Sequence, residues 1–292
     1  MKKSVLALSI AAMLVAPSIQ AVELGGSVRY GLVHNTKDDG DSSLQNRGSR
    51  LKGSGDIDLG NGLTGLGSFE LRLADERNGE VVNRKYSIGV KGDFGSFEMG
   101  VRDTAYDLST SDGTYWNGAF GLLGNRIEKN GAFVYKKSAG DVTFAIGGQM
   151  DPDDTDNDAL DLVDAAVKYK ANGLTLAAGV QSLADDGVAT NLTAGYDFSG
   201  WKARITLGTE DEDYTGGAEK TALNIQAFAG DAYAWYGLID TDEGGPEATR
   251  VGLGYVLKLG PKTLIWTEVF SQDPDDGTDT FSAVNVILKR DF

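Results

Sequence analysis

RLKGSGDIDL, residues 50–59, alternates polar and apolar residues along its whole length. Successive side chains of a strand point to opposite faces, so one face carries Leu51, Ile57 and Leu59 and the other carries the charged residues. The same alternation recurs, in stretches of roughly ten residues, through most of the chain after residue 21. A soluble β-protein keeps its charges outside a dry core. This repeated pattern instead predicts a barrel with lipid outside and water inside.

The first 21 residues have the form of a secretory signal. Lys2 and Lys3 precede a short apolar stretch, residues 5–16, and Ala21 supplies the small residue at a cleavage point. An uncleaved anchor is the alternative, but a bilayer span takes about 20 apolar residues. We predict cleavage after Ala21, export through the periplasm, and a mature barrel domain of residues 22–292.

Composition narrows the class of protein further. The chain has no cysteine and a net charge of −16, which the loss of two leader lysines brings near −18. Such an acidic chain is repelled by nucleic acid, and its 41% hydrophobic and 9% aromatic content argues against disorder. No stretch after residue 21 approaches about 18 consecutive apolar residues, so residence in a membrane requires a closed barrel.

Turn signals divide the chain into strands joined by two alternating kinds of connection. Seven short connections carry Gly, Asn or Asp, at residues 61–62, 93–95, 139–140, 172–173, 199–200, 230–231 and 260–261. Eight longer polar ones lie near residues 36–46, 76–82, 105–128, 151–160, 184–188, 210–219, 241–247 and 273–279. They predict an all-β fold, a transmembrane antiparallel β-barrel of about 16 strands. A barrel of that size encloses an aqueous channel.

The longer loops are rich in acid. Their Asp and Glu residues are Asp151, Asp153, Asp154, Asp156, Asp158, Glu210, Asp211, Glu212, Asp213, Asp273, Asp275, Asp276 and Asp279. A solvated rim explains them. Divalent cations bridging the loops to anionic lipid headgroups or lipopolysaccharide are the alternative, although no loop has EF-hand spacing. We expect no other cofactor.

Aromatic residues occur near the expected strand ends, at Tyr30, Tyr86, Tyr196, Phe198, Trp201, Tyr233, Trp235, Tyr255, Trp266 and Phe292. Their amphipathic rings suit the two interfacial girdles of a barrel. Ordinary strand propensity explains any one of them equally well. We predict outward rings at both membrane interfaces.

At this point the chain resembles the Gram-negative general porins, which are trimeric channels. The similar segments are residues 49–54 and 58–63, the hairpin of residues 89–100, Asn125-Arg126 with residues 130–135, and a closing strand that ends in Phe292. The resemblance implies a homotrimer, an assembly signal at Phe292 and an inward-folded third loop that narrows the pore. The third loop reads SDGTYWNG at residues 111–118, which differs from the family's Pro-Glu-Phe-Gly-Gly run.

The third loop, residues 105–128, has the composition of a segment packed on the barrel wall. It carries large apolar residues, of which Tyr115, Trp116 and Phe120 are the predicted anchors. Its acidic residues are Asp103, Asp107, Asp112 and Glu128, counting both ends. A loop that covers the barrel mouth or clasps a neighbouring subunit is the alternative.

A basic wall is predicted to face this loop. Strand parity places Arg29, Arg50, Lys52, Arg72 and Arg102 on the water face. Arg84 has outward parity, and lipid exposure of arginine costs about 2–4 kcal/mol at mid-membrane. We therefore expect a β-bulge or an interfacial position at Arg84. Opposed charges across a narrow pore orient dipolar water and solutes.

The predicted function is passive diffusion of small hydrophilic solutes and ions across the outer membrane. The single histidine, His34, leaves little room for catalysis, and we expect no enzyme activity. The alternatives are a sugar- or anion-specific channel, which calls for an aromatic stripe along the lumen, and a closed structural or adhesive barrel. The acid excess suggests a mild cation preference, which the basic wall opposes.

Replacing Asp107 and Asp112 together with asparagine is expected to shift the zero-current potential in a salt gradient toward anions. The reason is that two negative charges leave the narrowest part of the pore. An unchanged zero-current potential would show that this loop does not form the constriction.

Overall fold

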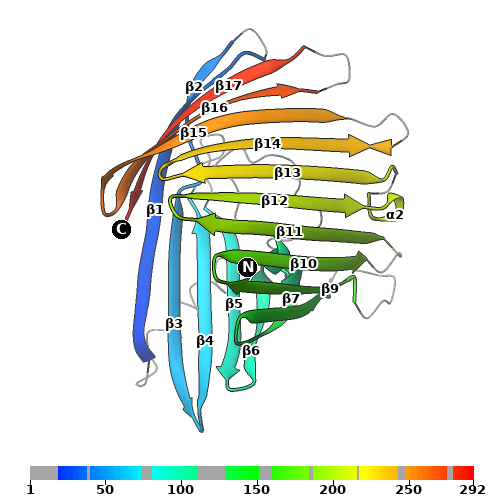
Figure 1. Ribbon diagram of the computed structural model, residues 1–292. Helices are drawn as coiled ribbons and strands as arrows, with labels where there is room; N and C mark the ends of the chain where they lie inside the picture. The colour runs from blue at the N-terminus through cyan, green and yellow to red at the C-terminus, as the bar shows by residue number, and fades with distance from the viewer. Residues whose placement is uncertain are drawn as a thin grey trace.

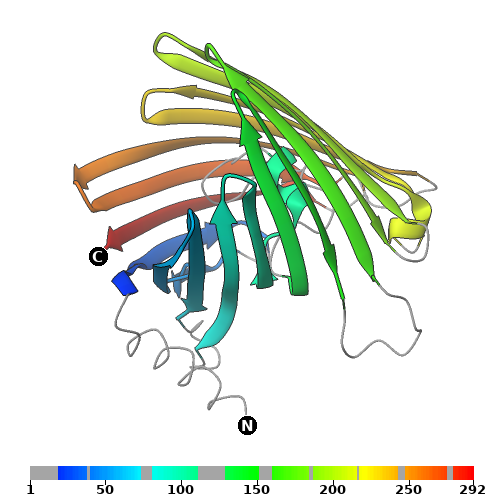
Figure 2. The ribbon, with the colours of Figure 1, turned by 90° about the horizontal axis from the view of Figure 1, so that it is seen from below.

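The computed structural model describes residues 19–37, 40–73, 81–110, 129–150, 160–183, 187–215, 217–242, 247–274 and 279–292. Nearly all of them form one antiparallel sheet that curls into a barrel (Figures 1 and 2). The first strands and the 3-10 helix η1 are β1 Ile19–Asn35, β2 Ser42–Asn46, β3 Arg50–Gly60, β4 Leu63–Arg72, β5 Val82–Gly92, β6 Gly95–Arg102, η1 Ala105–Ser109, β7 Lys129–Ala139 and β8 Val142–Gln149.

The second half continues the same up-and-down order. Its elements are β9 Leu162–Ala171, β10 Leu174–Leu183, β11 Val188–Phe198, β12 Trp201–Glu210, α2 Glu212–Thr215, β13 Lys220–Ala229, β14 Ala232–Thr241, β15 Ala248–Gly260, β16 Thr263–Asp273 and β17 Phe281–Asp291. From β3 onward each strand pairs with the next, and β17 returns to pair with β1, for example Leu288 with Tyr30. The sheet is therefore closed.

The strand count agrees with the prediction. Both β2 and β3 pair with β1, β2 near one end of it and β3 near the other. They are two parts of one barrel strand, interrupted at residues 47–49. Counted in this way, the described residues form sixteen barrel strands.

All seven predicted short turns are present between the strands. Asn61 and Gly62 both have positive φ, 52° and 76°, and Asn172 and Gly173 have 50° and 82°. Two consecutive left-handed residues form the turn whose twist matches that of the flanking strands. The two Asn-Gly pairs therefore fix the register of β3 with β4 and of β9 with β10.

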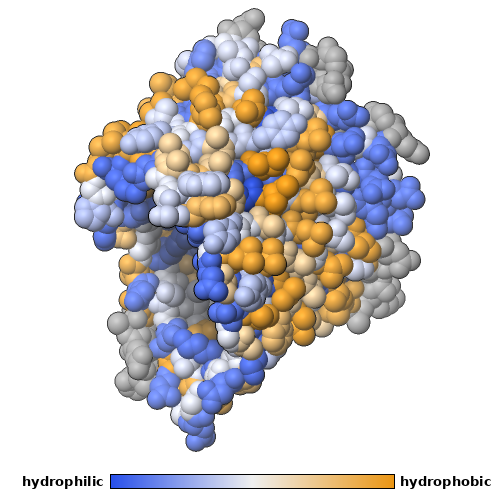
Figure 3. All heavy atoms as spheres, viewed as in Figure 1, coloured by the Kyte–Doolittle hydropathy of each residue, from blue (hydrophilic) through white to orange (hydrophobic). Residues whose placement is uncertain are grey.

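The outward face is apolar. Val163, Val167, Leu176, Leu192, Ile205 and Leu253 are between 44% and 59% exposed in the isolated chain, as expected of side chains that meet lipid. Figure 3 shows a hydrophobic band over the strands, with hydrophilic residues gathered at the end where α2 lies. The inside-out pattern predicted from residues 50–59 is confirmed.

The start of β1 touches the predicted leader boundary. Ile19 pairs with Ile57 and Gln20 with Asp56, and the register is irregular between Gln20 and Glu23. Residues 1–18 lie outside the described part of the chain. Cleavage after Ala21 remains a prediction.

Aromatic rings on the inner wall lie against glycines of the neighbouring strand. A Cβ at Gly254 would lie 2.0 Å from the Tyr233 ring, and one at Gly252 would lie 2.5 Å from the Trp235 ring. Glycine therefore provides the space that these two inward rings occupy.

Substituting Gly254 with alanine is expected to displace the Tyr233 ring and to lower the free energy of unfolding by about 1–3 kcal/mol, the usual range for overpacking. The measurement is the urea midpoint of the folded barrel in lipid vesicles. Gly260→Ala is the matched control, because nothing lies within 4 Å of a Cβ there. Equal midpoints for the two variants would contradict the prediction.

Candidate functional site

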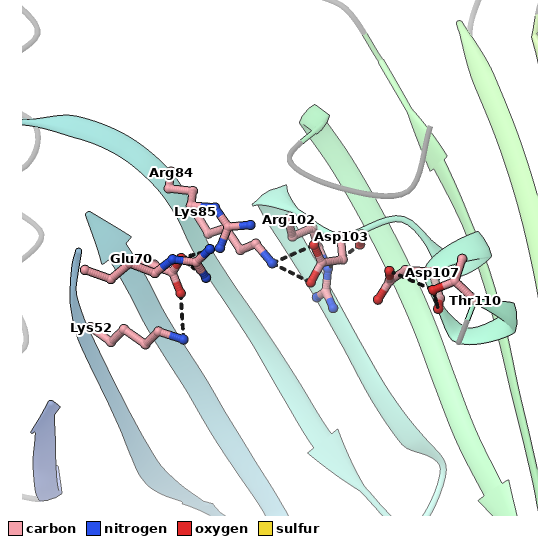
Figure 4. A network of polar contacts seen from close by, with 9 residues as sticks. Lys52, Glu70, Arg84, Lys85, Arg102, Asp103, Asp107 and Thr110 are labelled. Atoms are coloured by element: carbon pink, nitrogen blue, oxygen red, sulfur yellow. Dashed lines mark hydrogen bonds and ion pairs between the residues drawn. The ribbon is translucent and has the colours of Figure 1, made fainter. Parts of the chain in front are cut away.

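Glu70 is the centre of a charged network on the inner wall (Figure 4). Its carboxylate lies 3.1 Å from the Arg50 guanidinium and 2.8 Å from the Lys52 ammonium, and it also pairs with Arg84. Only 8% of the Glu70 side chain is exposed. Among the described residues, three cations therefore surround one buried carboxylate, so this part of the wall carries more positive than negative charge.

A β-bulge brings Arg84 into this network. Glu70 pairs with Lys85 and Leu71 pairs with Asn83, so Arg84 is the extra residue between the two pairs. The strand parity that points Tyr86 and Ile88 outward, 47% and 65% exposed, would point Arg84 toward lipid. The bulge turns its side chain inward. The predicted bulge is confirmed.

Two further ion pairs extend the network along β5 and β6. The Lys85 ammonium lies 2.6 Å from both carboxylate oxygens of Asp103. The Arg102 guanidinium lies 3.0 Å from Glu98. Sequence reasoning missed Glu70, Lys85 and Glu98. Their inward parity was the available signal in the sequence.

The remaining members of the predicted basic wall are more widely spread. Arg29 points inward, donates to Ser27, and lies 5.8 Å from the centre of the Trp266 ring. Arg72 is at the exposed end of β4, beside Gly48. Arg50, Lys52 and Arg84 therefore form a cluster around Glu70. Arg102 lies farther along the wall, beside Asp103 (Figure 4).

The beginning of the third loop folds inward. Tyr106 and Ser109 of η1 are both 0% exposed, and η1 packs against β8, β9 and β10. A Cβ at Gly179 would lie 2.3 Å from the Ser109 hydroxyl, so this glycine leaves room for the helix. Figure 4 shows Asp107 projecting from η1 on the side of Asp103 and Arg102.

Asp164 of β9 anchors this segment. The backbone N–H of Tyr106 donates to its carboxylate at 2.5 Å, and Thr104 and Ala105 also hydrogen-bond to it. Asp164 is 2% exposed. The predicted anchors and two of the predicted acids lie outside the described residues, namely Tyr115, Trp116, Phe120, Asp112 and Glu128.

Three of the predicted girdle aromatics point the other way. Tyr233, Trp235 and Trp266 lie on the inner face and are 5%, 2% and 6% exposed. The prediction failed because membrane girdles and inner-wall packing both place aromatic residues near strand ends, and only parity separates them. Tyr30, Tyr86, Tyr196, Phe198, Trp201 and Tyr255 are 41–51% exposed, as outward rings should be.

Cationic side chains cover these inner rings. Lys289 lies 5.6 Å from the centre of the Trp266 ring, on which Arg29 also lies. Arg250 lies 5.5 Å from the Phe270 ring. The wall of β14–β17 therefore combines apolar packing with positive charge.

Phe292 lies at the seam of the barrel. Its backbone N–H donates to Gly26 at 3.2 Å, next to the pairing of β17 with β1. Its ring is 54% exposed. The predicted role as an assembly signal remains a prediction.

The acidic loops are described only in part. Asp211 accepts hydrogen bonds from the backbone N–H groups of Tyr214 and Val188, both at 2.8 Å, which explains its place before α2. Within the described residues, no group of three or more acidic or histidine side chains could hold a metal ion. Residues 151–159 lie outside that part of the chain, and a cation there remains a prediction.

None of the helices in the described ranges is long and apolar enough to span a membrane.

Comparisons with known proteins agree with this geometry. The family model of the Gram-negative porins matches residues 4–277. None of the curated protein sequences matches the chain. Two solved structures are similar at TM-scores of 0.77 and 0.75, the anion-selective porin from Comamonas acidovorans and the trimer form of OmpT, an outer membrane protein of Vibrio cholerae.

These two structures share 20% and 16% sequence identity with the chain. The alignments cover 93% and 94% of this chain and 99% and 100% of the other. A porin mutant from Rh. blastica gives a TM-score of 0.67 at 16% identity, over 93% of this chain and 100% of that one. At these identities the likeness shows the fold.

Replacing Asp164 with alanine is expected to expose the Tyr106 amide to hydrogen exchange about 10- to 100-fold faster. A hydrogen bond to a charged group contributes about 1.5–3 kcal/mol, and its loss lowers the cost of local opening by that amount. The measurement is amide exchange of the folded barrel in detergent. Amides of β13 and β14 serve as the internal control. Unchanged exchange at Tyr106 would show that packing on Gly179 holds η1 without this carboxylate.

Proposed function

The chain belongs to the Gram-negative porin family, and on that premise we propose that it forms an outer-membrane channel for passive diffusion of small hydrophilic solutes and ions. The observation that carries the proposal is the charged inner wall around Glu70, enclosed by a barrel whose outer face is apolar. Charged side chains on the inside of a membrane barrel require water there.

The charges of the wall and of the third loop provide the selectivity. Lys52 and Arg84 lie on one side, and Asp107 projects from η1 on the other (Figure 4). A field across the lumen orients water and dipolar solutes and disfavours apolar ones. The channel therefore discriminates by charge and polarity.

A weak anion preference follows from the balance of charges along β3–β6. Among the described residues, this part of the pore holds five cations against four acids. The cations are Arg50, Lys52, Arg84, Lys85 and Arg102, and the acids are Glu70, Glu98, Asp103 and Asp107. This local positive surplus favours a weak anion preference over the mild cation preference that the net charge of −16 suggested. The printed name of the similar Comamonas acidovorans porin, anion-selective, points the same way.

A homotrimer is the proposed assembly, with outer-membrane lipid and lipopolysaccharide around it. The trimer form of the similar Vibrio cholerae protein supports it. Export through the periplasm after removal of residues 1–21 belongs to the same proposal. His34 hydrogen-bonds to Ser42 at 3.0 Å on the exposed ends of β1 and β2. The absence of enzyme activity remains a prediction.

The alternative functions are less well supported. A sugar-specific channel needs aromatic rings that solutes can reach, and the inner rings Trp235, Trp266 and Phe270 are 2–9% exposed. A closed structural barrel gives no reason for a charged network on the inner wall. We therefore keep passive diffusion as the conclusion.

The test is single-channel conductance of the refolded mature chain in a planar bilayer under a salt gradient. Stable ohmic steps that close in thirds are expected, with a reversal potential of the sign for anions. One unit charge about 8 Å from an ion in water changes its energy by about 0.5 kcal/mol, a factor of about two in local concentration. Lys52→Gln with Arg84→Gln should therefore lower the anion-to-cation permeability ratio at least about twofold.

Lys258→Gln is the matched control, because this lysine pairs with Asp231 at the short-turn end, far from the network. It should leave the ratio unchanged. A folded barrel that inserts into the bilayer but conducts no ions would contradict the diffusion proposal. If the double variant conducts with an unchanged anion-to-cation permeability ratio, this wall does not determine the selectivity of the channel.

A further inference from the structure

The two ends of the barrel carry very different charges, and the longer-loop end of β8–β17 is the acidic one. Its five connections are residues 150–161, 184–187, 211–219, 242–247 and 274–280. They contain six, two, four, three and three Asp or Glu residues in turn, and no Lys or Arg. The acids among their described residues are Asp161, Asp211, Glu212, Asp213, Glu219, Asp242, Glu247 and Asp279.

The strand ends beside these connections do not offset this charge. Glu210 at the end of β12 and Lys220 at the start of β13 are partners in register, so they add one charge of each sign. The side chains of Glu212, Glu219 and Asp242 are exposed. This end of the barrel, which Figure 3 shows as hydrophilic around α2, is therefore a strongly negative mouth.

The short-turn end is close to neutral. It comprises the seven short turns, three strand residues on each side of them, and the last three residues of β17. Its cations are Lys91, Lys137, Lys170, Lys202, Lys258, Lys262, Lys289 and Arg290. Its anions are Asp58, Asp93, Asp141, Asp197, Asp231, Asp291 and the terminal carboxylate of Phe292. Some of these charges form ion pairs, for example Lys258 with Asp231 at 2.5 Å and Lys289 with Asp291 at 2.9 Å.

The constriction lies inside the acidic mouth. A Cβ at Gly179 would lie 2.3 Å from the Ser109 hydroxyl of η1, and Gly179 is four positions inside the end of β10 at Leu183. The described residues around η1 and Glu70 have a small positive surplus. Among the described residues, the net charge therefore changes from strongly negative at the longer-loop mouth to nearly balanced in the interior and at the short turns.

This asymmetry makes the flow of ions depend on the direction of the voltage. The fixed negative charge of the mouth concentrates mobile cations and excludes anions. A voltage that is positive on the longer-loop side drives cations into the lumen, while anions enter from the short-turn end and cannot leave through the acidic mouth. Salt therefore accumulates inside. The opposite voltage draws anions out at the short turns, and the mouth admits few to replace them, so the lumen is depleted of salt.

We propose that the channel rectifies, carrying a larger ionic current when its longer-loop side is positive. The proposal deepens the proposed function, on which it rests, because rectification requires an open channel. Fixed charge acts over the Debye length, which is about 30 Å at 0.01 M salt and about 3 Å at 1 M. Rectification therefore belongs to dilute salt, and the current steps in 1 M salt stay ohmic.

The test requires channels whose orientation is known. The chain has no cysteine, so one introduced cysteine can mark a single end of the barrel. Nothing lies within 4 Å of a Cβ at Gly217, beside α2, so Gly217→Cys adds a thiol to the longer-loop mouth without a clash. A maleimide attached to a polymer too large for the channel, added to one side, changes the current only when the longer loops face that side.

The experiment measures the current of the refolded mature chain in a planar bilayer at equal voltages of opposite sign, in about 0.01 M and about 1 M potassium chloride. In dilute salt, the current with the longer-loop side positive should exceed the opposite current about twofold, the factor by which one unit charge at about 8 Å changes local ion concentration. In 1 M salt the ratio of the two currents should be close to one.

Removing charge from the acidic mouth should weaken the effect. The triple variant Glu212→Gln, Glu219→Gln and Asp242→Asn is expected to lower the current ratio in dilute salt by about 1.3-fold, because fewer cations then gather at this mouth. All three side chains are exposed, so the variant keeps the barrel intact.

The matched control removes the same charge from the other end. Asp58→Asn, Asp93→Asn and Asp141→Asn change three exposed carboxylates at the short turns, and this variant should raise the current ratio, since the two ends then differ more. A decrease of the ratio in both triple variants would overturn the proposal, because the position of the charge would then not matter.

The remaining outcomes separate rectification from diffusion. Oriented channels that conduct equally in both directions in dilute salt would overturn rectification alone, and so would a larger current of the opposite sign. A ratio that is the same in dilute and in 1 M salt would also overturn it, and this comparison needs no charge variant to fold. A barrel that inserts and conducts no ions contradicts the diffusion proposal itself.

Discussion

Every backbone N–H and C=O group inside a bilayer must find a partner within the protein, and the rest of this structure depends on that constraint. The pairing of β17 with β1 satisfies it by removing the sheet edges. Closure then divides each strand into residues that face lipid and residues that face water. The charged interior, the apolar exterior and the channel follow from this division.

Local departures from regular pairing produce the details of the lumen. A single extra residue in β5 turns Arg84 from the lipid side to Glu70. Glycines perform the opposite task, because their missing side chains make room for Tyr233, for η1 and for the stem of Arg204. The bulge therefore sets the direction of a charged side chain, and each glycine leaves space for a side chain or helix that packs against it.

Much of the fold was predictable because its signals are local. Asn61-Gly62 and Asn172-Gly173 mark turns by their own backbone preference, and parity placed Arg50 and Lys52 on the water face. The site was predictable only in part. Glu70 and Asp164 lie among their partners through pairing between strands, and Trp235 and Trp266 turned out to face inward, where a neighbouring glycine or cation covers them.

The sequence by itself determined the inside-out barrel, the number of its strands and the turns, since each depends on the order of residues within one strand or one loop. Tertiary structure decided which charges meet. Glu70 lies 18 positions from Lys52 and 14 from Arg84 along the chain, yet the register of β3, β4 and β5 and one bulge bring the three together. Register across several strands depends on every intervening turn and bulge, so no single segment carries that information.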